Sequence, residues 1–110
     1  MFRRSAFLGL MALALSLLTT LQASAENRWV TIHNNTGYDI ITFHGSHRDA
    51  PDWQEDILGS SILRAGQSIN INFDDGTGYC IFDFRAAFED GDVLVKKGVN
   101  ICQIADFYYN

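Results

Sequence analysis

The chain has 110 residues, with 13 acidic and eight basic side chains and a formal net charge of −5. This length fits a single domain. Because a negatively charged surface repels phosphate groups, nucleic acid and anionic membrane are poor candidate partners, whereas proteins and cationic ligands stay possible.

The first 25 residues have the pattern of a secretory signal peptide. Arg3 and Arg4 form a positive n-region, residues 6–18 are an uncharged apolar run, and Ala23-Ser24-Ala25 fits a small-x-small cleavage site. The apolar run is shorter than the about 20 residues that span a bilayer. We therefore predict cleavage after Ala25 and a periplasmic or secreted location. A retained anchor and twin-arginine export are the alternatives.

Residues 26–110 are then predicted to form one domain with a disulfide. They hold all 13 acidic side chains against six basic ones, a formal balance of −7. A domain this small is marginally stable without a crosslink. In an oxidising compartment Cys80 and Cys102 should pair. That bond closes a loop of 21 intervening residues and contributes about 3 kcal/mol in the chain-entropy model. Free thiols or a metal site are the alternatives.

Two strands open the predicted domain. Residues 28–34 alternate between apolar and polar, with Val30 and Ile32 on one face, and residues 38–44 are almost continuously apolar, as in a buried strand. The intervening Asn35-Thr36-Gly37 has the composition of a turn. The two segments are therefore predicted to form a hairpin.

A short helix is predicted over residues 51–58. Pro51 suits its first turn, acidic residues follow at the positive N-terminal end, and Gly59 can terminate it. Trp53 and Ile57 would share one face of this helix and cover one end of the core.

Two further segments have strong period-2 patterns. In residues 67–73 the apolar side chains Ile69, Ile71 and Phe73 alternate with polar ones. Residues 79–89 form the longest predicted strand. Its inward face would consist of Cys80, Phe82, Phe84, Ala86 and Phe88.

A long hairpin is predicted from residues 79–89 and a returning strand, residues 93–104. A two-residue turn at Asp90-Gly91 would place Phe88 opposite Val93 and Ala86 opposite Val95. An uninterrupted ladder misaligns the two cysteines by one residue. A bulge at Gly98, or across Lys97-Gly98, would bring Cys80 opposite Cys102.

The same register predicts an apolar stripe on the outer face of the hairpin. Its members are Ile81, Leu94, Val99 and Ile101. Because monomers rarely expose large apolar patches, we expect another element, such as the helix with Trp53, to cover the stripe. Binding of a partner to the stripe is the alternative.

Metal ligands are a weaker possibility. His44, His47 and Asp49 provide two imidazoles and a carboxylate on a short polar segment, although Arg48 would oppose a cation. The acidic cluster at residues 74–76 lacks the ligand spacing of an EF-hand, because the twelfth residue from Asp74 is Arg85, and a looser site would need it to approach the second cluster at residues 89–92. Asp-Gly pairs are typical of turns, which is how we interpret both clusters.

No catalytic constellation is recognisable. Ser46, Ser60, Ser61 and Ser68 lack a Gly-x-Ser-x-Gly setting, the cysteines are assigned to the disulfide, and an 85-residue domain leaves little room for a deep cleft. We therefore predict a protein that is not an enzyme and needs no cofactor.

The segment beginning at Asp74 reads DDGxGxCxFDFRAxFxDG. With the pattern around it, from Trp29 to about Cys102, it resembles a family of small exported bacterial proteins of unassigned function, sometimes labelled argininosuccinate lyase. Such lyases carry a GSSxMP serine loop, whereas here Gly59-Ser60-Ser61 precede Ile62. The resemblance therefore implies fold and export only.

The sequence predicts an all-β, mainly antiparallel β-sandwich of six or seven strands with one short helix and one disulfide. The expected function is that of a non-catalytic periplasmic binding or interaction module, with a periplasmic protein or a cationic ligand as partner. The alternative is a divalent-metal-binding protein that uses His44, His47 and Asp49 or the acidic turns.

Overall fold

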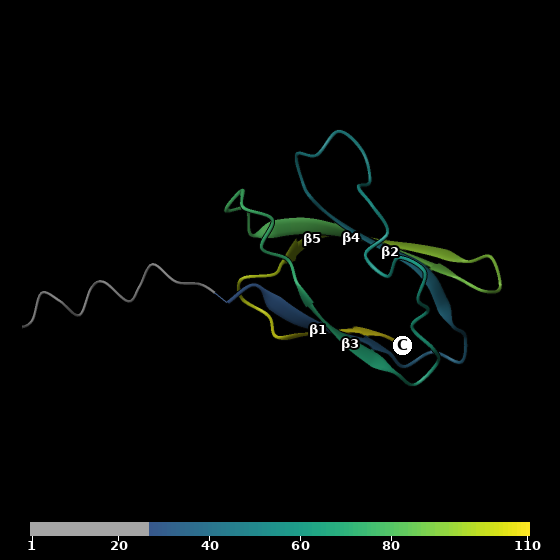
Figure 1. Ribbon diagram of the computed structural model, residues 1–110. Helices are drawn as coiled ribbons and strands as arrows, with labels where there is room; N and C mark the ends of the chain where they lie inside the picture. The colour runs from purple at the N-terminus through teal and green to yellow at the C-terminus, as the bar shows by residue number, and fades with distance from the viewer. Residues whose placement is uncertain (1–26) are drawn as a thin grey trace, which may run out of the picture.

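The computed structural model describes residues 27–110, and the predicted signal peptide lies outside the described residues. Within this range the chain is all-β, with six strands in two three-stranded sheets (Figure 1). One sheet has the order β3-β1-β6 and the other β2-β4-β5. The strands are β1 (Trp29–Asn34), β2 (Ile40–His47), β3 (Ser68–Asn72), β4 (Ile81–Phe88), β5 (Val93–Asn100) and β6 (Asp106–Tyr109).

The predicted hairpin between the first two strands is wrong. β1 and β2 belong to different sheets, because the chain crosses from one sheet to the other between them. The fully buried Asn34 directs this crossing. Its side-chain nitrogen, Nδ2, donates to the backbone carbonyl oxygens of Tyr38 at 2.8 Å and Leu63 at 3.0 Å. Its side-chain oxygen accepts from the Thr36 amide at 3.1 Å. These bonds form an Asx turn that redirects the backbone.

The predicted helix over residues 51–58 is also wrong, since none of the described residues is helical and this segment is loop and turn. Its backbone bonds to the edge of β2 instead. The Ile57 amide donates to the Phe43 carbonyl at 2.8 Å, and the Phe43 amide donates to the Asp56 carboxylate at 2.8 Å. Pairing with a strand edge gives hydrogen-bond partners to backbone N–H and C=O groups, many of which a two-turn helix would leave unpaired at its ends.

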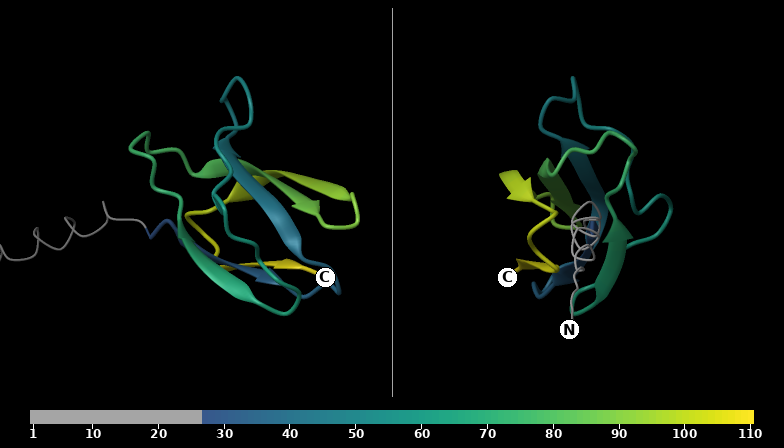
Figure 2. Two further views of the ribbon diagram at one scale, coloured as in Figure 1. Left: turned by 45° about the vertical axis from the view of Figure 1, so that its right-hand side comes forward. Right: turned by 90° about the vertical axis from the view of Figure 1, so that its left-hand side faces the viewer.

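The two sheets share one apolar core. The period-2 predictions for β3 and β4 are confirmed, with Ile71, Phe73 and the inward residues of β4 from Phe82 onward buried. Rings from the two sheets meet edge to face, Phe43 against Tyr109 and Phe84 against Phe107, with centroids 6.4 and 5.1 Å apart. Figure 2 shows the two groups of strands facing each other from two further directions.

The β4–β5 hairpin forms as predicted, but its register differs by one residue. Ala86 lies opposite Leu94, not Val95, and Ala87, not Phe88, lies opposite Val93. The Phe88 amide donates to the Asp92 carbonyl at 2.8 Å, so three residues form the turn. The third, Gly91, has a φ of 94°, which is the left-handed conformation that a three-residue hairpin loop requires.

The predicted bulge across Lys97-Gly98 is confirmed. Phe84 pairs with Lys96 and Phe82 with Val99, so Asp83 faces two residues. Gly98 has a φ of 72°, and its amide donates to the Asp83 carboxylate at 3.0 Å. A glycine in this conformation is a common bulge residue.

The disulfide between Cys80 and Cys102 is confirmed, with the two Cα atoms 5.3 Å apart. The prediction that Cys80 lies directly opposite Cys102 is wrong. Cys80 pairs with Ile101 instead, since the Ile101 amide donates to the Cys80 carbonyl at 2.9 Å. Cys102 lies in a turn just after β5, which ends at Asn100 and not at residue 104. The chain then forms β6, which pairs in parallel with β1.

Candidate functional site

The proposed metal ligands are not brought together. We expected His44 and His47 on a loop, but β2 extends to His47. Residues three apart on a strand point to opposite faces. His44 Nδ1 bonds to the Gln54 carbonyl oxygen at 2.7 Å, whereas the ring of His47 stacks on Tyr79 with a centroid distance of 4.4 Å. Within residues 27–110 no group of three or more His, Cys, Asp or Glu side chains is placed to hold a metal ion.

The predicted outer stripe is not a continuous surface. Val99 and Ile101 are buried in the core, since the observed register directs Val99 inward together with Phe82. Ile81 is half-buried, and Leu94 is 46% exposed.

The acidic clusters form turns that their own side chains stabilise. In the first, the carboxylate oxygens of Asp74 and Asp75 accept from the amides of Gly76 and Thr77 at 3.1 and 3.0 Å. In the second, Asp90 accepts from the Asp92 amide at 3.0 Å. Partial burial raises the pKa of Asp75, but hydrogen bonds from Thr77 outweigh it, so the pKa lies below its ordinary value.

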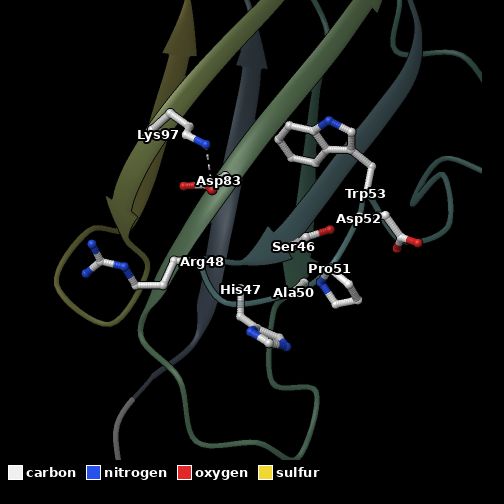
Figure 3. Close-up of a pocket in the computed structure, with 9 residues that line it drawn as sticks. All are labelled: Ser46, His47, Arg48, Ala50, Pro51, Asp52, Trp53, Asp83 and Lys97. Carbon is white, nitrogen blue, oxygen red and sulfur yellow. Dashed lines mark ion pairs between the residues drawn. The ribbon is translucent and has the colours of Figure 1, made fainter.

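A hollow of about 340 Å³ lies between β2, the loop that follows it, and the β4–β5 bulge. Figure 3 shows the indole of Trp53 on one side of Ser46 and the Asp83–Lys97 pair on the other. The Ser46 hydroxyl oxygen accepts from the Gln54 amide at 3.0 Å, which anchors the loop that carries Trp53. The bulge orients the opposite wall of the hollow. The Asp83 carboxylate accepts a hydrogen bond from the Gly98 amide and forms an ion pair with the Lys97 ammonium at 3.6 Å.

The charges around this hollow balance. Arg48 and Lys97 are the cations in its lining, and Asp52 and Asp83 are the anions. The Lys97 side chain is 75% exposed, whereas the Asp83 side chain is 14% exposed. A bound molecule could therefore compete with Lys97 for the carboxylate while it packs on the indole.

A second polar cluster lies on the outer face of the other sheet. Ser68 Oγ is 2.7 Å from His33 Nδ1, and His33 Nε2 is 2.8 Å from Asp106 Oδ1. The ring of Tyr108 stacks on the imidazole, with centroids 4.4 Å apart. When the imidazole proton is on Nε2, Nδ1 can accept the Ser68 proton, which is the arrangement of a nucleophile, a base and an orienting carboxylate.

Sequence reasoning missed this cluster because its members are far apart in the chain. His33 is opposite Ser68 in the β1–β3 ladder and beside Tyr108 in the β1–β6 ladder. The cluster could be recognised only after the sheet order was known, since no local motif contains Ser68, His33 and Asp106 together.

No membrane-spanning helix occurs within residues 27–110. Comparisons with protein-family models, with curated proteins and with solved structures found no match to this chain. The resemblance to small exported bacterial proteins therefore stays a prediction that rests on the DDGxGxCxFDFRAxFxDG segment.

Proposed function

We propose that this protein is an exported, non-catalytic binding module built as a β-sandwich, and that it binds its ligand in the hollow beside Trp53. The shared core and the ring contacts between the sheets support face-to-face packing. The signal-peptide pattern and the Cys80–Cys102 disulfide support export to the periplasm or beyond.

The observation that carries this proposal is the placement of an indole opposite a partly neutralised carboxylate across a small hollow. An aromatic wall with a few convergent polar groups is the usual composition of a small-molecule site. Because the charges of the lining balance, the ligand is a small molecule without a large net charge. It has one flat apolar face for Trp53 and amine or hydroxyl groups for Asp83.

Tryptophan fluorescence tests this function directly. Trp29 and Trp53 are the two tryptophans of the chain, so Trp29→Phe leaves Trp53 as the reporter of the hollow. We expect saturable quenching or a blue shift of the Trp53 emission on titration with tyramine, with a zwitterionic amino acid or with the neutral disaccharide maltose. Asp83→Asn should weaken the response about tenfold or more, the effect of losing a charged hydrogen bond.

Asp74→Asn is the matched control, since Asp74 does not line the hollow and its loss removes the same charge. Equal weakening by both variants would contradict a site at Asp83. Saturable binding of spermidine alone would favour the cationic-ligand prediction, in which the balance of −7 attracts the ligand. No response to any of these compounds would contradict the small-molecule function.

The Ser68–His33–Asp106 cluster favours a second candidate function, ester hydrolysis. In that reaction Ser68 Oγ attacks the ester carbonyl as its proton passes to His33 Nδ1, the alcohol leaves with that proton, and water hydrolyses the acyl-serine. Hydrolysis of p-nitrophenyl acetate by the purified protein tests it. Equal rates for the native chain and Ser68→Ala would eliminate this candidate. It is second because its side chains lie on an open sheet face, with Asp106 45% exposed.

A further inference from the structure

β5 is an edge strand with apolar side chains exposed on both faces. It is the last strand in the order β2-β4-β5, so only β4 pairs with it among the described residues. Val93 is 44% exposed, Leu94 46% and Val95 52%. Such an edge is a template for pairing with another strand.

The other edge strands, β2, β3 and β6, do not expose such an apolar run. The free side of β2 is covered by the loop that follows it, through the bonds between Phe43 and the segment Asp56-Ile57 and through a bridge from Ile40 to Leu63. β3 presents exposed Ser68, Asn70 and Asn72, and β6 has only four residues. The exposed apolar run on β5 is therefore a feature of that edge alone within residues 27–110.

The hairpin ladder determines which backbone groups of β5 face outward. Because the Phe88 amide bonds to the Asp92 carbonyl, the even-numbered residues of β5 before the bulge direct their backbone groups toward β4. Val93 and Val95 consequently direct their N–H and C=O groups to the open edge.

The charges of the strand are arranged as in a self-complementary sequence. Asp90 and Asp92 precede the apolar residues, and Lys96 and Lys97, the two lysines of the whole chain, follow them. In an antiparallel pair of identical strands, the acidic end of each copy meets the basic end of the other. We propose that a second copy of this chain docks on β5, and that the two β2-β4-β5 sheets join into one continuous sheet across a two-fold axis.

The backbone restricts the register of this dimer. Hydrogen bonds form only if Val93 and Val95 face residues whose backbone also points outward, so shifts by one residue are excluded. With Leu94 opposite itself, Val93 lies opposite Val95 and Asp92 opposite Lys96, each pair occurring twice. A shift by two residues in either direction places Leu94 opposite a charged side chain. The register centred on Leu94 is therefore the one that the proposal requires.

Lysines on a strand edge can also prevent pairing with another strand. Exchanging the charges of Asp92 and Lys96 distinguishes this role from the proposed attraction between two copies. Analytical ultracentrifugation of the purified, oxidised protein measures dimerisation. Asp92→Lys sets Lys against Lys, and Lys96→Asp sets Asp against Asp, so each should weaken the dimer about tenfold, while the double exchange restores it. Asp49→Lys makes the same charge change as Asp92→Lys on the loop after β2, outside the paired strands, and should leave the association unchanged.

A crosslink tests the register. Leu94→Cys would place two sulfurs at the two-fold axis, where opposed Cβ atoms lie within disulfide range, so a covalent dimer should form under mild oxidation. In Lys96→Cys the two cysteines would be about 14 Å apart, four residues along the strand, and should not crosslink. A protein that is monomeric up to about 1 mM, or a double exchange that fails to restore the dimer, would overturn the proposal. These variants leave Trp53 and Asp83 unchanged, so the result is independent of the ligand in the hollow.

Discussion

The hydroxyl of Tyr109 gives a prediction that depends closely on the structure. The residue is 5% exposed, its ring lies edge to face against Phe107 and Phe43, and its oxygen is buried with no hydrogen-bond partner in the described part of the chain. An unsatisfied buried hydroxyl costs about 1–3 kcal/mol. Tyr109→Phe keeps the ring and removes this cost, so we expect the free energy of unfolding to rise by about 1–2 kcal/mol. Urea denaturation at neutral pH, read by circular dichroism, measures the change.

The same substitution should alter the pH dependence. Burial raises the pKa of Tyr109 above its ordinary value of 10.0. Below pH 10 the hydroxyl is neutral in both states. As the pH rises above 10 the unfolded chain ionises first, so stability that is complete below that pH is lost, by about 1.4 kcal/mol per unit. At about pH 11 the native protein should therefore have lost about 1.4 kcal/mol more than Tyr109→Phe.

A less stable Tyr109→Phe would show that the hydroxyl makes a favourable bond and would refute the reasoning. Tyr109→Ala is the control for the ring itself and should destabilise by about 3–5 kcal/mol, as for other buried aromatics. If both variants lost a similar amount, the hydroxyl and not the ring would be the stabilising part of this side chain.

Three further predictions concern stability and are checked by the same denaturation. Asn34→Asp keeps the shape of the side chain but removes two buried donors, so we expect a loss of about 2–4 kcal/mol; an unchanged midpoint would contradict the role of Asn34 in the crossing. Gly45→Ala would place its Cβ 2.6 Å from Phe73 and should cost about 1–3 kcal/mol, whereas Gly37→Ala, with nothing within 4 Å, is the control. Reduction of the Cys80–Cys102 disulfide should cost about 3 kcal/mol, and a reduced protein of equal stability would contradict this estimate.

Local patterns in this sequence predicted local structure well. Alternation located β3 and β4, the cysteine count predicted the disulfide, and Gly98 marked the bulge. Each of these follows from neighbouring residues or from the predicted oxidising compartment. The one-residue error in the hairpin arose because a two-residue and a three-residue turn are both compatible with an Asp-Gly pair, and Gly91 takes the third position of the longer one.

Pairings between distant segments could not be predicted. β1 pairs with β3 and β6 and not with β2, and the buried amide of Asn34 that controls this crossing looks in the sequence like an ordinary turn residue. The segment around Trp53 has helical end signals, yet its backbone bonds to β2, because tertiary contacts outweigh the propensity of a two-turn helix. The cluster at His33 could not be found without this sheet order.

The parallel pairing of β1 with β6 has a consequence for how the chain folds. The first strand described lies between the third and the last, so Thr31 is aligned with Asn70 on one side and with Asp106 on the other. No early portion of the chain can complete this sheet, since its final strand ends at Tyr109. Formation of this sheet therefore requires β6, and it is slow for its size because its contacts are long-range. Late completion of this sheet is compatible with the export that the signal-peptide pattern predicts.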